Sequence, residues 1–158
     1  MQSLTPEILI EALGLEPHPE GGAYREIYRS AMRTGDRHLA TAIYFLLGPG
    51  EFSAWHRVAH DELWFYHGGS PLRLKRITPG GQHTEAILGV DVLKGERPQI
   101  LIPAGEWQAA TPRDSEGWTF VSCVVSPGFD FADFEMNDHE TMLTRFPHLA
   151  QDLVLAGP

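Results

Sequence analysis

Short stretches of alternating apolar and polar residues, rich in β-branched and aromatic side chains, fill the chain between residues 23 and 125. Glycine- and proline-rich turn signals separate them at 48–50, 67–71, 78–81, 103–105 and 111–117. Short strands divided by such turns predict an all-β sandwich or barrel. The predicted strands are Ala23–Arg29, Leu39–Leu47, Glu51–Val58, Glu62–His67, Leu72–Ile77, His83–Leu88, Gln99–Ile102, Gln108–Ala110 and Trp118–Val125.

Both ends of the chain carry a helical pattern instead. Thr5 is a good N-cap, Pro6 suits the first helical position, and apolar residues then recur at helical spacing until Gly14. His139–Leu155 has roughly helical periodicity that Pro147 interrupts, which predicts a closing helix in two pieces. The sequence contains no internal repeat, so we expect one domain over residues 1–158.

Charge and cysteine content exclude several functions. Twelve Lys and Arg against 21 Asp and Glu give a net charge of −9, which disfavours nucleic acids and anionic membranes as partners. The N-terminus lacks the basic head and apolar run of a signal peptide, and no run reaches the ~18 apolar residues of a spanning helix, so we expect a cytoplasmic protein. Cys123 cannot form an intrachain disulfide and lies in an apolar run, which favours a small buried side chain over a nucleophile.

His56 and Glu62 are the candidate chemical centre. If Glu51–Val58 and Glu62–His67 are neighbouring antiparallel strands joined by a turn, these two side chains converge on one face. An imidazole beside a carboxylate can hold a divalent metal, act as an acid–base pair, or bind a neutral substrate through hydrogen bonds. A carboxylate among apolar neighbours is costly to bury without a partner, so Glu62 is expected to face a wet or occupied cavity.

The same stretch resembles the cupin superfamily. Its first motif matches Gly50, His56, Glu62 and Gly69, and its second motif matches Pro103, Gly105 and Gln108. The segments PHPEGGAYRE, SAWHRVAHDELWFYHGG, IPAGEWQAA and VSPGFDFADFE, in this order, are similar to the cupin 5 family, domain of unknown function 985. The resemblance implies a double-stranded β-helix, or jelly-roll barrel, with short terminal helices, and a homodimer. By the alternation of their strands, Trp55 and Phe65 are expected to point outward, under a helix or at a subunit contact that would suit such a dimer.

Two departures from the general cupin pattern weaken the metal alternative. Val58 stands where metal-binding cupins have a second histidine, and Gln108 stands where the second motif supplies one. His56, Glu62 and Gln108 then remain as candidate ligands for a divalent metal ion. This set is poor for Zn²⁺ or Fe²⁺, which prefer more imidazole or carboxylate.

Without a metal, the predicted barrel interior suits a small polar or sugar-like ligand. Arg25 either binds an anionic group at the pocket mouth or pairs with Glu20 and fixes the first strand. The other candidate substrate-binding side chains are polar or aromatic: Ser53, Trp64, Tyr66, Trp107 and Gln108.

Three functional hypotheses follow. The first is an epimerase or isomerase in which His56 and Glu62 are the catalytic acid–base pair, as in metal-free cupin epimerases. The second is a small-molecule binding module without chemistry. The third is a metal-dependent cupin with a depleted ligand set.

Overall fold

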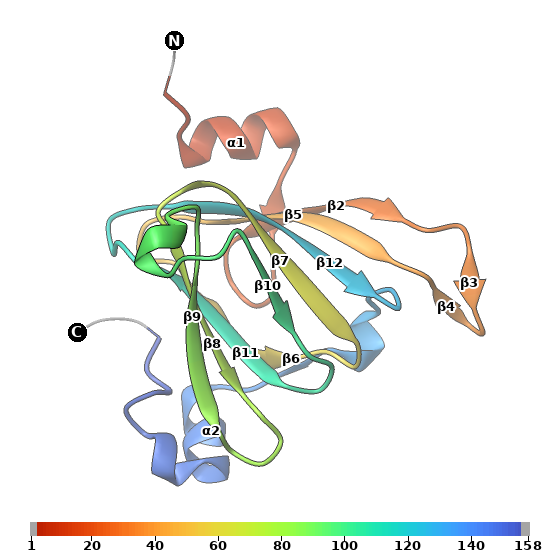
Figure 1. Ribbon diagram of the computed structural model, residues 1–158. Coiled ribbons are helices and arrows are strands. Elements are labelled where there is room, and N and C mark those ends of the chain that lie inside the picture. Colours follow the sequence, from red (N-terminus) through yellow and green to blue (C-terminus); the bar gives the residue numbers. More distant parts are fainter. Residues whose placement is uncertain (1–2, 156–158) are drawn as a thin grey trace.

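Two antiparallel sheets form the body of the protein in the computed structural model, which describes residues 3–155 (Figure 1). One sheet has the order β1 (Glu16–Pro17), β2 (Ala23–Arg29), β5 (Thr41–Leu47), β12 (Thr119–Ser126), β7 (Asp61–Gly69) and β10 (Gln99–Ile102). The other has the order β13 (Glu135–Met136), β6 (Ser53–Arg57), β11 (Trp107–Pro112), β8 (Leu72–Ile77) and β9 (His83–Leu88). This is the jelly-roll arrangement that the sequence predicts.

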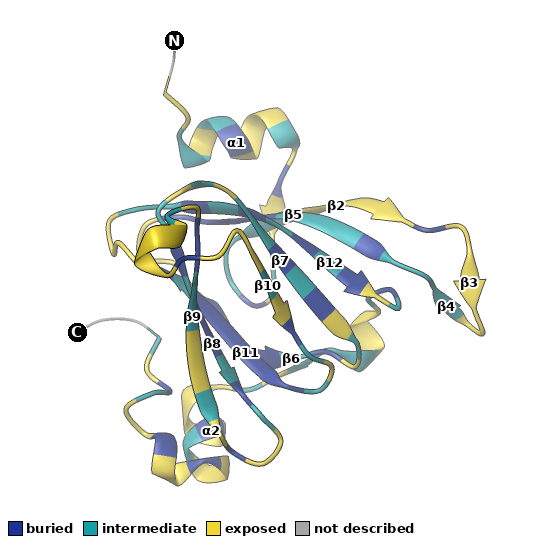
Figure 2. Ribbon diagram, viewed as in Figure 1, coloured by how far each residue is buried: buried dark blue, intermediate teal, exposed yellow. Residues whose placement is uncertain are grey.

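A short hairpin of β3 (Arg33–Thr34) and β4 (Arg37–His38) extends the β2–β5 pair beyond the body (Figure 1). Exposed residues dominate the outer part of β2, whereas β11 is almost entirely buried (Figure 2). The first sheet therefore has one exposed end, and in the second sheet the middle strand β11 lies in the interior.

The predicted pairing of the His56 strand with the Glu62 strand is wrong. β6 pairs with β11 and β13, whereas β7 pairs with β12 and β10, so the two strands belong to different sheets. The residues between them cross from one sheet to the other instead of forming a hairpin. His56 and Glu62 nevertheless come together, because each projects from its own sheet into the space between the sheets.

The helices confirm the signals at both ends of the chain. In α1 (Pro6–Leu13), Thr5 Oγ1 accepts a hydrogen bond from the amide of Ile8, and Gly14 ends the helix in the left-handed conformation. The closing helix is indeed in two pieces, α2 (His139–Arg145) and the 3₁₀ helix η3 (Pro147–Leu149). Two further 3₁₀ helices are η1 (Val92–Lys94) and η2 (Phe131–Asp133). Between residues 3 and 155, no helix has the length and apolar character to span a bilayer.

Three apolar clusters hold these layers together. The cluster between the sheets includes Phe45, Trp64 and Leu74. The cluster beneath α2 and η3 includes Trp55 and Trp107, which therefore cover the outer face of the second sheet. The outward direction predicted for Trp55, under a helix or at a subunit contact, is confirmed, because Trp55 packs beneath the C-terminal helices. Trp107, which we expect in the interior, is instead buried on the same outer face, because its position on β11 alternates with that of the inward-facing Gln108.

Candidate functional site

The loop between β1 and β2, residues 18–22, brings a second carboxyl group to His56. Gly21 has φ +112°, and a Cβ atom there would lie 2.1 Å from the carbonyl oxygen of Phe52, so glycine is required for this close approach. The carbonyl of Glu20 accepts a hydrogen bond from the amide of Ala54 (2.8 Å), which ties the loop to the start of β6. The buried Glu20 side chain therefore lies beside His56.

His56 has hydrogen-bond partners on both ring nitrogens. Nδ1 lies 2.6 Å from the carbonyl oxygen of Ala54, and Nε2 lies 3.1 Å from Oε2 of Glu20. A carbonyl oxygen only accepts, so the imidazole proton is on Nδ1. Nε2 of the neutral ring is then an acceptor, and the contact is attractive when Glu20 is protonated and donates to it.

Burial supports this protonation state. It raises the pKa of Glu20 to about 8, although the nearby Ser53 hydroxyl opposes the shift, and it lowers the pKa of His56 despite the opposing effects of Glu62 and the Ala54 carbonyl. Both groups are thus neutral near pH 7. The pair shares one proton between an oxygen and a nitrogen, an arrangement suited to general acid–base catalysis.

Glu62 is the other carboxyl group of the site, and a chain of hydrogen bonds through Gln108 and Trp64 fixes its orientation. The indole Nε1 of Trp64 donates to Oε1 of Gln108 (2.9 Å), and Nε2 of Gln108 donates to Oε1 of Glu62 (2.7 Å). Oε2 is therefore the oxygen left to carry a proton. Burial raises the pKa of Glu62 to about 7; nearby His56 lowers it, Glu20 raises it further and Gln108 lowers it. Glu62 thus changes charge close to neutral pH.

His18 lies on the other side of Glu20. Its Nδ1 accepts a hydrogen bond from the backbone amide of Glu20 (3.1 Å), which leaves the ring proton on Nε2. Burial, followed by the effect of nearby His56, lowers the pKa of His18 to about 4. His18 is therefore neutral under physiological conditions, and its role at Glu20 is to accept a hydrogen bond and pack.

These groups lie in a cavity of about 190 Å³. Its polar side chains are His18, Glu20, Glu26, Arg29, His56 and Glu62, and the rest of its surface is largely apolar and aromatic. That part is formed by Tyr24, Thr41, Ile43, Val58, Cys123, Val125, Phe129, Phe131 and Phe134. Burial raises the pKa of the Cys123 thiol well above its usual range, so this residue is part of the wall and remains a thiol.

The predicted site residues fall into three groups. His56 and Glu62 line the cavity together. Ser53, Trp64 and Gln108 are fully buried behind it: Trp64 and Gln108 orient Glu62, and Ser53 Oγ has no hydrogen-bond partner of normal geometry among the described residues.

Tyr66 and Arg25 lie away from the cavity. The Tyr66 hydroxyl donates to the carbonyl of Gly69 (2.6 Å), and its ring packs against the core between the sheets. Arg25 donates to the carbonyl of Leu13 (3.1 Å) and makes no pair with Glu20, because it alternates with its neighbours Tyr24 and Glu26, which point toward the cavity.

Sequence reasoning missed His18, Glu20 and the three phenylalanines of residues 129–134 as cavity residues. The adjacent glycines after Glu20 were the available signal, since they indicate a backbone that approaches another segment closely. The register that brings this loop against β6 depends on tertiary packing and has no local signature.

The candidate metal ligands do not fit a divalent ion. The Trp64 indole only donates, so it holds the amide oxygen of Gln108, while the amide nitrogen faces Glu62. Gln108 therefore presents no oxygen on the side where Glu62 would bind an ion. No reaction step is assigned to a metal at His56, Glu62 and Gln108.

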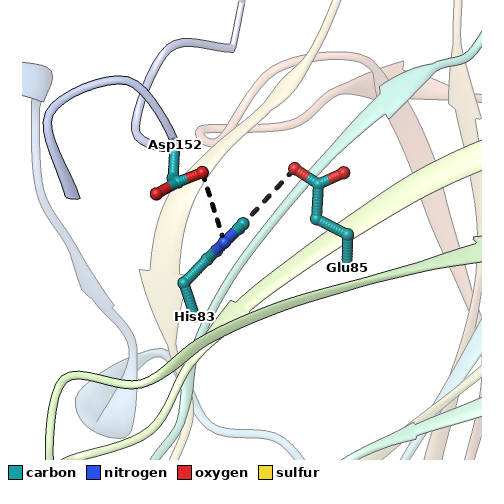
Figure 3. Close-up of side chains that lie close together, drawn as sticks. All are labelled: His83, Glu85 and Asp152. Atoms are coloured by element: carbon teal, nitrogen blue, oxygen red, sulfur yellow. Dashed lines mark ion pairs between the residues drawn. The ribbon is translucent and has the colours of Figure 1, made fainter.

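One group of side chains in residues 3–155 has ligand atoms as close together as a metal site requires: His83, Glu85 and Asp152 (Figure 3). Nδ1 of His83 faces Asp152 (3.5 Å) and Nε2 faces Glu85 (3.7 Å), and a single ion can bind only one ring nitrogen. Glu85 also pairs with Arg73 (3.0 Å) and Lys75 (3.6 Å), whose charges oppose a divalent cation. These contacts link the C-terminal segment to β9.

Comparison with known proteins identifies the family. The profile of the family described as "Cupin superfamily (DUF985)" matches residues 7–137. The structure is similar to that of protein SO0799 from Shewanella oneidensis, with 41% identity, a TM-score of 0.91 and coverage of 100% of this chain and 99% of that one. It is also similar to a hypothetical protein from Leishmania major, with 34% identity, a TM-score of 0.86 and coverage of 93% and 95%.

More distant relatives share a smaller fraction of identical residues. The uncharacterized protein YML079W of Saccharomyces cerevisiae is 28% identical over 144 residues, 79% of this chain and 71% of that protein. Oxalate decarboxylase of Bacillus subtilis shares the fold at 14% identity, with a TM-score of 0.59 over 91% of this chain and 43% of that one. The chain belongs to the cupin superfamily, in the family known as domain of unknown function 985.

Proposed function

We propose that the cavity catalyses proton transfer on a small molecule, as an epimerase or isomerase that acts at a carbon next to a carbonyl group. One observation carries this proposal: Oε2 of Glu20 lies 3.1 Å from Nε2 of His56 in a cavity that Glu62 also lines. Two carboxyl groups whose pKa values burial raises toward neutral pH are suited to act as acid and base.

The roles follow from the protonation states. Glu62, with a pKa of about 7, is partly ionised near neutral pH and accepts the proton from carbon. Glu20, with a pKa of about 8, keeps its proton, and the Glu20–His56 pair delivers it to the substrate. Trp64 and Gln108 hold Glu62 in place, so the base is positioned before the substrate arrives.

Hydrogen exchange in D₂O tests the proposal without knowledge of the natural substrate. Phenacylamine and phenacyl alcohol are compact probes that carry protons next to a carbonyl. We expect the wild-type protein to accelerate the exchange of these protons over buffer. The isosteric changes Glu20→Gln and Glu62→Gln should each reduce this acceleration by about 100-fold or more, the usual contribution of a general acid or base.

Surface variant Glu11→Gln serves as the control, because Glu11 is exposed on α1 and lies outside the cavity. Equal exchange rates in wild type and both cavity variants would contradict the assigned roles. Binding of the probes without acceleration would favour the second candidate, a binding module, which the largely apolar wall of the cavity also supports.

A further inference from the structure

The balance of charges in the cavity indicates what it binds. Three carboxyl groups line it, from Glu20, Glu26 and Glu62, and Arg29 is the one guanidinium or ammonium among the described lining side chains. Arg29 is already engaged: it contacts both carboxylate oxygens of Glu26 (2.6 and 3.2 Å) and the carbonyl of Phe129 (3.2 Å). The two buried carboxyl groups are therefore left without a cationic partner.

In the part of the chain that the structure describes, no other group facing these carboxyls supplies a positive charge. His18 and His56 are the remaining basic side chains of the cavity, and burial keeps both imidazoles neutral. Cys123 faces them as a thiol. An anionic ligand would thus meet acids and neutral groups, whereas a cation would allow Glu62 to ionise without remaining unpaired.

The walls favour a compact organic cation over a metal ion or a long polyamine. Tyr24, Phe129, Phe131 and Phe134 place four aromatic rings around the cavity, the composition found where ammonium groups are recognised. The three phenylalanine rings hold one another edge to face, with centroids 4.9 to 6.0 Å apart. A dry cavity of about 150 Å³ holds benzene, so one of about 190 Å³ admits roughly eight to ten non-hydrogen atoms.

We infer that the cavity binds a compact organic cation, an ammonium group on an apolar body, and that Glu62 releases its proton when it binds. The inference rests on the proposed site and names the class of its substrate. Carboxylates and phosphates are excluded as ligands, since no free cation lines the cavity within residues 3–155. Ligands as large as a nucleotide sugar are excluded by volume.

Three matched probes test the inference: benzylamine, benzyl alcohol and benzoate, which have similar size and differ in charge. Calorimetry in buffers of different ionisation enthalpy measures both affinity and proton release. At about pH 7 we expect benzylamine to bind at least about tenfold more tightly than benzyl alcohol, with benzoate the weakest. Benzylamine affinity should fall as pH decreases from about 7 to about 5.5, because protons then compete for the Glu62 carboxylate.

The variant Glu62→Gln should reduce both the preference for benzylamine and the number of protons released, while Glu11→Gln changes neither. Benzyl alcohol binding as tightly as benzylamine, tightest binding of benzoate, binding without proton release, or no binding of any probe at millimolar concentration would each overturn the inference. Benzylamine binding with proton release but no catalysed exchange of phenacylamine would leave it standing and contradict only the proposed catalysis. Catalysed exchange of phenacyl alcohol without a preference for cations would overturn the inference and leave the proposed catalysis standing.

Discussion

Replacing Glu20 by glutamine should make the protein more stable while it removes the proposed acid. Glutamine has nearly the same shape and can donate to Nε2 of His56, as the protonated carboxyl does. It has no ionised form that must be kept out of the interior. The wild-type carboxyl, in contrast, is held neutral by burial that raises its pKa from 4.5 to about 8.

The magnitude follows from linkage. As pH rises, the unfolded chain releases this proton first, so the stability of the wild type is fully present below about pH 4.5 and decreases until about pH 8. Each pH unit in this window costs about 1.4 kcal/mol. At pH 7 the variant should therefore be more stable by roughly 2–3 kcal/mol, and near pH 5 the difference should be below about 1 kcal/mol.

Urea unfolding at pH 5, 7 and 8 measures this difference in stability directly. A shift of the unfolding midpoint at a constant slope reports a change in the free energy of unfolding. The surface variant Glu11→Gln should show no comparable pH-dependent gain. A Glu20→Gln protein that is less stable than the wild type at pH 8, or whose difference from the wild type is equal at pH 5 and pH 8, would refute the reasoning. In that case Glu20 would be ionised in the folded protein.

Three further predictions concern the surroundings of the site. Trp64→Phe leaves the buried amide oxygen of Gln108 without its donor; we expect a loss of about 1–3 kcal/mol in urea unfolding and weaker acid–base activity, and unchanged exchange kinetics would contradict the orienting role. Lys75→Met removes donors to the carbonyls of Asp152 (2.8 Å) and Val154 (3.0 Å); amide hydrogen exchange should increase over residues 149–155, and unaltered protection would show that the lysine does not hold this segment. Elemental analysis after incubation with Mn²⁺, Zn²⁺ or Fe²⁺ should give well below one ion per chain, and one tightly held ion that is lost in His56→Ala would contradict the amide orientation of Gln108.

The fold could be predicted largely from local patterns, because strand alternation and turn residues are local properties. β2, β8, β9 and β10 have the predicted bounds, and the capping residues of α1 act as expected. Strand pairing could not be read in the same way: His56 and Glu62 are six positions apart, yet they project from different sheets.

The site could be predicted only in part. The motif spacing indicated His56, Glu62 and Gln108, and these residues are connected in the structure through the cavity and its hydrogen bonds. Glu20 lies in a loop that is distant in sequence from His56, and its contact with His56 depends on Gly21 packing against Phe52. The expected homodimer stays a prediction; of the two positions predicted for Trp55, under a helix or at a subunit contact, the structure shows the first.

The central claim is that Glu20 donates its proton to Nε2 of His56, and ¹⁵N NMR of the imidazole tests it most directly. Between about pH 5.5 and pH 7 we expect a protonated Nδ1, with its one-bond coupling to hydrogen, and an unprotonated Nε2 that accepts a hydrogen bond. In Glu20→Gln this tautomer should persist. A ring that carries its proton on Nε2, or an imidazolium that titrates near its ordinary pKa, would contradict the account.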